Sequence, residues 1–596
     1  MPRPLLMWAI KNDWGGLRSG SAIEAQANQA SRLENLYREI GVLRRRKGTT
    51  PLGTADLSPV QDQDGIEWFK ISATEYLLAA HNGRVVDWFA AAAQVTNSSG
   101  KLTSGTDANF TWLDEKVIIG DGLKQNVRFN GTRIDQVLPQ APATPLSSAA
   151  GAAGNPDGTY TYYVTFLSAD ANNSELSPLS SPITVVTKKI SLTSIPICPA
   201  GQDCSGRNIW RNKNGGSIYY LVTTIADNTT TIFTDDVADT SLGARLNDFL
   251  GENLQNKRFG PCRYLISHQN RLVGALDETT PDRQTIVISN SRAPWYSPLL
   301  PDFDDPEQGT RIPLQGPGAG TITGIHSHGD KIAVFTGGAA YLLTTSDQLL
   351  DYSLHRFSDH GCVAHRTIQS FRDMLLWLAT DGVYLAAEGV GVVRISDDIA
   401  ESLPLTDAAQ MSKANAFVLG MRYYLCFQGS AFYWDSRYRT WGQLTAWPWR
   451  DTAVSVYTTS AEQRVYGSRS GVARAWQMET GATDNGTAIP AIWQSAGIDL
   501  GLPYRDKRIH RIGAEFKKGT GTATVKLYRD TGSSPIQTAT LDLSTEPVTG
   551  SQISRLDQRA VEQARAEFFS FSVEHADATA TEFEIEQVKL FYSQAG

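Results

Sequence analysis

The chain has 596 residues, of which 41% are hydrophobic and 19% are charged, so it is long enough for several packed domains and too apolar for a disordered protein. Its 54 lysines and arginines are outnumbered by 62 aspartates and glutamates, and the net charge of −8 disfavours tight binding of duplex nucleic acid. The five cysteines are scattered and imply no disulfide framework, and no stretch has the length of a membrane span.

The first part of the chain, residues 1–50, is predicted to be an N-terminal arm with one amphipathic helix. Ser21 and Glu24 have the spacing of a capping box, and Gly41 is a suitable helix stop. Apolar residues between them recur at steps of three and four, as on one helix face. They are Ile23, Ala27, Ala30, Leu33, Tyr37 and Ile40. We therefore expect a helix over residues 21–40.

A basic run follows this segment and supplies the candidate contact residues of the sequence. It consists of Arg44, Arg45, Arg46 and Lys47. Such a run contacts DNA phosphates or an acidic partner, or it is a solvated or interface-pairing segment.

Beyond the arm, one hairpin recurs along the chain: a polar turn, a strand, a second turn that usually contains glycine, and another strand. Its copies begin at Tyr76, Lys116, Arg271, Lys331, Met374, Arg422 and Arg464. Most are spaced like the blades of a β-propeller, in which the hairpin is half of a four-stranded blade. The one large gap becomes normal if residues 141–250 are an insertion. We expect about seven blades over residues 51–140 and 251–486. N- and C-terminal strands that share a blade would change this count by one, and unrelated hairpins of an irregular sandwich are the alternative.

Two β-sandwiches complete the predicted all-β fold. Within residues 141–250, Tyr160, Tyr162, Val164 and Phe166 alternate on one face of a strand, and the strand spacing predicts a fibronectin-III-like sandwich. Residues 487–596 show a similar pattern of strands, which predicts a jelly-roll-like sandwich. Cys198 and Cys204 flank a loop and could pair if oxidised, but we expect two reduced thiols.

A search for chemistry predicts no catalytic, cofactor-binding or metal-binding residues. The sequence has no P-loop, HExxH helix, CxxC pair or GxSxG elbow. A glycine-rich stretch at residues 316–324 precedes a strand, so it lacks the helix N-terminus that holds phosphate. His326 and His328 could face the same way, but no third metal ligand is placed by the sequence.

The N-terminal segment resembles the opening of many phage tail proteins, which have a Gly-Gly turn, a helix with polar steps and a Leu-Arg-x-Arg-x-Gly strand. The matching positions are Gly15, Gly16, Asn28, Asn35, Leu43, Arg44, Arg46 and Gly48. The pattern from Asp227 to Gly243 also recurs in phage tail proteins, and Asp435 with Trp441 looks like the step of kelch-type blades in which the tryptophan packs between neighbouring blades. Up to about residue 480, the chain is similar to the nozzle (hub) proteins of short-tailed phages.

This resemblance implies a non-enzymatic structural subunit of a viral tail. Such subunits form a homo-oligomer, a hexameric ring below the portal and adaptor proteins. They extend the DNA channel and dock tail fibres or spikes during DNA ejection. Genomic DNA passes without sequence-specific binding, and no cofactor or membrane span is implied. The location is the virion tail, and the host cytoplasm during assembly. Arg44, Arg45, Arg46 and Lys47 are then candidates for contact with the adaptor or DNA.

Two other functions fit the same sequence. A carbohydrate-binding or glycoside-cleaving propeller would need a pocket at its mouth, and cleavage would need two close carboxylates there. A minor tail protein of a long-tailed phage would differ in ring order and in its position in the virion.

Overall fold

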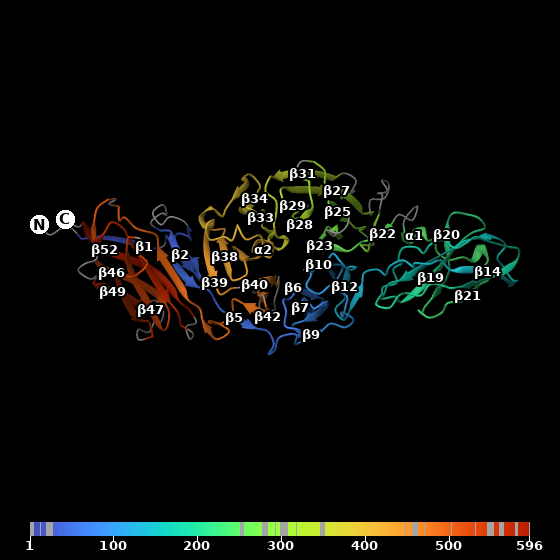
Figure 1. Ribbon diagram of the computed structural model, residues 1–596, viewed down its shortest axis with the longest axis horizontal. Coiled ribbons are helices and arrows are strands. Elements are labelled where there is room, and N and C mark those ends of the chain that lie inside the picture. The colour runs from blue at the N-terminus through green and yellow to red at the C-terminus, as the bar shows by residue number, and fades with distance from the viewer. Residues whose placement is uncertain are drawn as a thin grey trace. The chain divides into compact units, whose positions relative to one another are not determined.

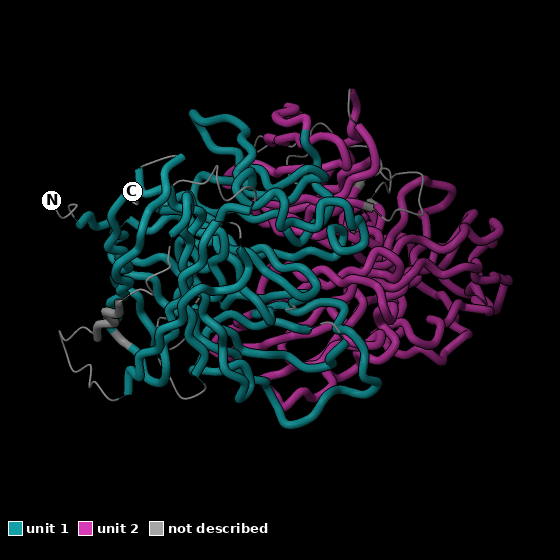
Figure 2. Tube along the Cα trace, turned by 60° about the vertical axis from the view of Figure 1, so that its left-hand side comes forward, with its two compact units in different colours: residues 1–68, 360–596 teal, residues 69–359 magenta. Residues whose placement is uncertain are grey.

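The computed structural model divides the chain into two compact units (Figure 2). Unit 1 comprises residues 1–68 and 360–596, and unit 2 comprises residues 69–359. The structure describes residues 5–594 except 12, 20–27, 251–255, 277–283, 292–293, 299–307, 317–318, 346–351, 448, 456–462, 470, 502–503, 531, 545–553, 560–564 and 578–581. Strands dominate both units (Figure 1), and the α-helices α1 (Asn247–Leu250) and α2 (Ala408–Ser412) are short. The predicted all-β class is confirmed.

Four antiparallel sheets of four strands each run through unit 2, and the first strand of the first sheet begins in unit 1. The first two sheets are β6 (Gly65–Ile71), β7 (Thr74–His81), β8 (Arg84–Asp87) and β9 (Ala93–Gln94), then β10 (Asn109–Leu113), β11 (Lys116–Gly120), β12 (Val127–Phe129) and β13 (Ile134–Gln136). The next two are β23 (Cys262–His268), β24 (Arg271–Leu276), β25 (Thr285–Ile288) and β27 (Thr310–Pro313), then β28 (Ile322–His328), β29 (Lys331–Thr336), β30 (Ala340–Thr345) and β31 (Tyr352–Ser358). The short strands β22 (Asn256–Arg258) and β26 (Tyr296–Pro298) pair with each other.

Three further groups of four antiparallel strands lie in unit 1. One is a separate sheet, and the other two belong to sheets of nine and six strands. The first two groups are β32 (Gln369–Phe371), β33 (Met374–Ala379), β34 (Gly382–Ala387) and β35 (Gly391–Arg394), then β36 (Asn415–Leu419), β37 (Arg422–Cys426), β38 (Ser430–Asp435) and β39 (Thr440–Thr445). The last is β40 (Trp449–Val454), β41 (Val465–Arg469), β42 (Val472–Met478) and β5 (Thr49–Pro51). Its fourth strand therefore comes from the N-terminal part of the chain.

These seven four-stranded groups are the blades of a β-propeller, as the sequence predicted. Each predicted hairpin begins at or within two residues of the second strand of a blade. Middle strands of a blade are covered on both faces, so they read as continuous apolar runs rather than as an alternation. Ile332–Phe335 on β29 and Leu375–Ala379 on β33 are fully buried runs of this type.

The inserted sandwich in unit 2 has a core of aromatic and branched side chains. Tyr162, Val164 and Phe166 on β16 (Tyr162–Leu167) are buried, as their alternation predicted. Its sheets are β14 (Ser147–Ala153), β18 (Lys188–Thr193) and β21 (Phe233–Asp235); β15 (Gly158–Tyr160) and β17 (Ile183–Val185); and β16 (Tyr162–Leu167), β19 (Gly206–Asn212) and β20 (Tyr219–Ile225). The expectation of two reduced thiols was wrong, because Cys198 and Cys204 form a disulfide.

A run of three serines covers the outer edge of β16. The N–H groups of Ser174, Ser177 and Ser180 donate to the carbonyls of Phe166, Val164 and Tyr162, at 2.7, 2.9 and 3.0 Å. In return, each serine hydroxyl accepts the N–H of the same partner residue at 2.9 Å. An exposed strand edge is a template for unwanted pairing, and here the chain itself satisfies it.

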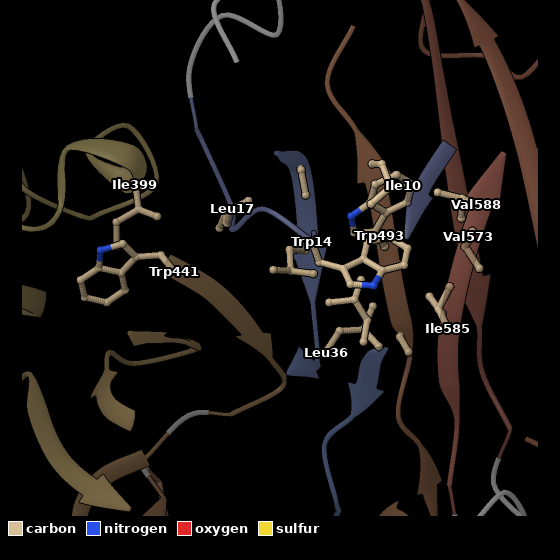
Figure 3. Close-up of a cluster of buried hydrophobic side chains, with 14 of the residues drawn as sticks. Ile10, Trp14, Leu17, Leu36, Ile399, Trp441, Trp493, Val573, Ile585 and Val588 are labelled. Atoms are coloured by element: carbon tan, nitrogen blue, oxygen red, sulfur yellow. The ribbon is translucent and has the colours of Figure 1, made fainter. Parts of the chain in front are cut away.

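The sandwich at the C-terminal side is built from both ends of the chain. One sheet contains β3 (Leu36–Glu39), β4 (Val42–Arg45), β52 (Glu584–Gln594), β46 (Lys507–Lys518), β49 (Ser554–Arg559), β1 (Leu6–Lys11) and β50 (Arg565–Ala566). The other contains β2 (Ala30–Glu34), β45 (Ala491–Ser495), β51 (Phe569–His575), β47 (Thr522–Arg529) and β48 (Gln537–Asp542), and β2 also touches β39. Ile10, Trp14 and Leu36 share a buried cluster with Trp493 and Val588 (Figure 3).

The predicted helix over residues 21–40 is wrong from Ala30 onward, and residues 20–27 lie outside the described part. Asn35 has a left-handed backbone, with φ of 56°, and separates two short strands, β2 and β3. Gly41, with φ of 79°, is the turn of the β3–β4 hairpin rather than a helix stop, and Ile40 at this turn is 88% exposed. The predicted domain boundaries stay a prediction.

Candidate functional site

The four basic residues of the predicted contact run have two different environments. Arg45 and Arg46 are only 4% and 2% exposed, whereas Arg44 and Lys47 are exposed. The alternation of side chains along β4 places Arg44 and Arg45 on opposite faces. Arg44 and Lys47 are therefore the exposed members of the run, and contact with an adaptor or DNA stays a prediction.

Arg46 binds inside unit 1. Its guanidinium donates to both carboxylate oxygens of Asp484, to Oδ1 of Asn35 at 2.8 Å and to the carbonyl of Thr445 at 3.2 Å. It also lies over the ring of Trp447, 4.4 Å from the ring centre. The two-pronged contact with a carboxylate is one that only the arginine fork makes. Arg46 thus joins the N-terminal segment to β39 and to the short strand β43 (Thr483–Asp484).

Arg45 and Arg44 contact the C-terminal strands instead. Arg45 donates to the carbonyl of Asp577 at 3.2 Å and lies 3.4 Å from Nδ1 of His575, and burial lowers the pKa of Arg45. Arg44 forms a salt bridge of 2.9 Å with Glu584, and its side chain stays about half exposed. Both contacts hold β4 to C-terminal residues within the sandwich to which β4 itself belongs.

Lys47 lies at a cavity of about 490 Å³ in unit 1. The cavity is lined by Lys47, Leu419, Gln463, Arg464, Val465, Gln477, Met478, Glu479, Thr480, Gly481, Ala482 and Glu582. Most of these residues come from β41, from β42 and from the loop that follows β42. The lining is mainly polar and holds two cations and two carboxylates.

Glu479 is bound to the N-terminal segment. Its Oε1 accepts the hydroxyl of Tyr37, and its Oε2 accepts the backbone N–H of Lys47 at 3.3 Å. Burial raises the pKa of Glu479, because a charged carboxylate loses water in this position. By contrast, the Lys47 ammonium and the Arg464 guanidinium have no polar partner among the described residues.

Sequence reasoning missed the partners of Lys47 at this cavity. Arg464 was visible only as the start of a hairpin, and Glu479 and Glu582 carried no signal. These residues lie more than 400 positions from Lys47 along the chain, and a single sequence holds no record of such proximity.

The Gly-Gly pair of the phage-like segment lies where the backbone approaches two neighbours closely. The N–H of Gly15 donates to the carbonyl of Asn28 at 2.8 Å, and a Cβ on Gly15 would clash with that carbonyl. A Cβ on Gly16 would lie 2.6 Å from Cβ of Thr440, beside the backbone of Trp441. Only glycine fits these two positions without a shift.

The second half of the segment contacts later parts of unit 1 at a second joint, by which we mean the contacts of Asn35, Arg46 and Gly48 with residues beyond position 440. Asn35 donates to Oγ1 of Thr445 and to the carbonyl of Pro490, both at 2.7 Å, and its Oδ1 accepts from Arg46. A Cβ on Gly48 would clash with the carbonyl of Thr483. Asn35, Arg46 and Gly48, which carry the resemblance to phage tail proteins, therefore all contact residues of this one joint.

The kelch-like pair also lies at a junction between blades. Asp435 is fully buried and accepts from Nε of Arg422 at 3.0 Å. Nε1 of Trp441, on β39, donates to the carbonyl of Ile395 at 2.6 Å, and Ile395 directly follows β35 of the preceding blade. Trp441 thus packs between neighbouring blades.

The two histidines weighed as metal ligands lie on β28. Burial and the neighbouring His328 lower the pKa of His326 to about 4, so His326 is neutral at pH 7. No group of three or more His, Cys, Asp or Glu side chains that could hold a metal ion occurs within the described residues.

No protein family and no curated protein matches the chain. Solved structures match at low similarity. The Neurospora crassa Pan2 WD40 domain is 8% identical, with 63% of this chain and 88% of that chain covered and a TM-score of 0.27. YCF48 from Cyanidioschyzon merolae is 8% identical, with 72% and 98% covered and a TM-score of 0.26. PorZ, a surface component of the type-IX secretion system of Porphyromonas gingivalis, is 9% identical, with 89% and 86% covered and a TM-score of 0.25. Within the described residues, no helix is both long and apolar enough to cross a membrane.

Proposed function

We propose that this chain is a non-enzymatic structural subunit of the tail of a short-tailed phage, a nozzle or hub protein that assembles into a ring, hexameric by the resemblance. One observation carries the proposal. The glycines, asparagine and arginine that resemble phage tail proteins lie at two joints where the backbone geometry and hydrogen bonds need those residue types. These contacts give the residues of the resemblance a structural role in this chain, which supports the proposal.

The parts of the fold suit this role. Propeller blades form a stiff wall, because each blade buries its faces against its neighbours. The net charge of −8 suits a channel through which DNA slides without sticking. The two sandwiches offer surfaces for portal or adaptor proteins and for fibres or spikes. The protein would reside in the virion tail, after assembly in the host cytoplasm.

The mass of the purified chain in solution, alone and mixed with candidate adaptor proteins, tests this proposal. We expect a ring of about six subunits, or one that forms only on the adaptor, visible by negative-stain imaging. A stable monomer that ignores the adaptors and binds or cleaves polysaccharide would overturn the proposal in favour of a carbohydrate-active propeller. A ring found in the long tail of another phage type would indicate a minor tail protein.

A further inference from the structure

The charged side chains that line the cavity beside Lys47 determine which kind of ligand it can bind. Lys47 and Arg464 are exposed, and neither side-chain cation has a polar partner among the described residues. An unpaired cation at the wall of a cavity favours an anionic group, because a charge-assisted hydrogen bond is about twice as strong as a neutral one. The cavity volume of about 490 Å³ lies within the range of ligand sites in proteins.

The two carboxylates of the lining do not cancel these cations. Glu479 is held by the Tyr37 hydroxyl and by the backbone N–H of Lys47, both from the N-terminal segment. Glu582 also has a partner of its own. The charged side chains that remain available to bind a ligand are therefore Lys47 and Arg464.

The rest of the lining can hold a peptide backbone. Gln463 and Gln477 each carry an amide that both donates and accepts, and Gly481 and Ala482 present main chain with little side-chain cover. None of the described residues that line the cavity is aromatic, so these residues offer no flat apolar surface on which a base would stack.

We propose that this cavity binds an acidic, extended segment of a partner protein, with one carboxylate on Lys47 and another on Arg464. The proposal deepens the proposed function and rests on it, since it names the chemistry of the partner that a ring subunit would contact near the basic run. It also assigns Arg464, which lies outside that run, to the contact.

DNA fits this site less well than an acidic peptide. A protein grips a phosphate backbone with many cations, and each neutralised phosphate adds to the affinity. Here only Lys47 and Arg464 offer positive charge. The other cations of the basic run cannot extend the site, because Arg45 and Arg46 are buried and Arg44 is paired with Glu584.

Fluorescence anisotropy with the full-length chain tests the proposal. The probes are labelled hexaglutamate, hexalysine and a short single-stranded oligothymidylate. We expect hexaglutamate to bind, hexalysine not to bind, and added salt to weaken binding. The double variant Lys47→Gln with Arg464→Gln should bind hexaglutamate at least about tenfold more weakly, as expected for the loss of charge-assisted hydrogen bonds.

The matched control removes the same two charges elsewhere in unit 1, as Lys413→Gln with Arg505→Gln, both at exposed positions. It should bind hexaglutamate like the unaltered chain. Equal losses in the two double variants, or no hexaglutamate binding at all, would overturn the proposal. Tighter binding of the oligonucleotide that is lost in the Lys47/Arg464 variant would reassign the cavity to nucleic acid.

Ring formation of the same double variant separates this proposal from the proposed function. A chain that still assembles into rings but shows no cavity-dependent hexaglutamate binding contradicts the peptide site alone. A chain that binds hexaglutamate through Lys47 and Arg464 but stays a monomer with every adaptor contradicts the nozzle function alone.

Discussion

Arg46 is one side chain on which the attachment of the N-terminal segment to the rest of unit 1 depends. It is buried, and its guanidinium satisfies Asp484, Asn35 and Thr445 together. Removing one partner of a buried ion pair leaves an uncompensated charge, which costs about 3–5 kcal/mol. We therefore expect Arg46→Gln to lower the melting temperature of unit 1 markedly, and Arg46→Lys to restore little because lysine has no fork.

Arg44→Gln is the control for this prediction, measured by the same thermal unfolding. Arg44 is about half exposed and makes one salt bridge with the buried Glu584, whereas Arg46 is fully buried, so we expect Arg44→Gln to lower the melting temperature less. A melting temperature that falls equally in Arg44→Gln and Arg46→Gln would contradict the assigned role of Arg46.

Glu67 should make the stability of unit 1 depend on pH. Burial, with a smaller effect of Asp451, raises the pKa of Glu67 from 4.5 to about 8. Because the folded pKa is raised, the fold favours the neutral acid. Its contribution is full below pH 4.5 and is lost as the pH rises to about 8. We expect the melting temperature to fall over this interval, and to fall less in Glu67→Gln.

Unfolding measured from pH 5 to pH 9 in both proteins checks this prediction. Other groups titrate in the same interval, so only the difference between the two proteins is informative. Identical pH profiles would show that Glu67 is not protonated in the folded chain at neutral pH.

Residue type alone could reveal some roles at this scale but not the burial of charges. Gly15, Gly16 and Gly48 stood out in the sequence as parts of a motif, and each has a steric reason in the structure. The same sequence could not show that Arg45 and Arg46 point inward. Asp484, which pairs with Arg46, lies 438 residues away, and nothing local marks it as a partner.

At the scale of elements, the serine run on β16 makes a clear prediction. Ser177 accepts the N–H of Val164, and the hydroxyl is buried. Ser177→Ala leaves this N–H without that partner, at a cost of about 1–3 kcal/mol. We expect faster hydrogen exchange at the Val164 amide and a lower melting temperature of unit 2.

Ser181→Ala serves as the comparison, since Ser181 is exposed and its side chain takes no part in the run. It should leave exchange at Val164 unchanged. If Ser177→Ala left the amide equally protected, the hydroxyl would not be the group that satisfies the edge of β16.

The propeller hairpins could be predicted from the sequence because their signal is local, whereas the fold of the N-terminal segment, predicted as a helix over residues 21–40, depends on distant strands. A blade strand covered on both faces leaves a continuous apolar run with a turn on each side, which is a local signal. Ala30, Leu33 and Tyr37 also have helical spacing, but two short strands broken at Asn35 bury the same residues. Tertiary pairing with β45 and β4 decided between the two.

At the scale of the whole molecule, the C-terminal sandwich should not fold without the N-terminal strands. β1 and β4 pair with β52, and β2 pairs with β45. A chain that lacks residues 1–52 would expose the cluster that holds Ile10, Trp14 and Leu36, and it would also lack β5. We expect this chain to aggregate, and co-expression of residues 1–52 to restore soluble protein.

Size-exclusion chromatography of both preparations measures this outcome. A chain that lacks only residues 1–5 keeps every strand and should behave like the full sequence. Soluble, cooperatively unfolding protein after the longer deletion would show that the C-terminal strands form a complete sandwich alone.

The pairing of β5 with β42, and of β1 and β4 with β52, also has a consequence during synthesis on the ribosome. At about 5–20 residues per second, the early strands would wait roughly 20 seconds to two minutes before their partners emerge. Unit 2 is continuous in the chain and can fold during that time, whereas unit 1 cannot close until translation is nearly finished. An incomplete chain would therefore lack the pairing of β5 with β42 and of β1 and β4 with β52, so unit 1 would reach its folded form only in chains that are synthesised to their last strand.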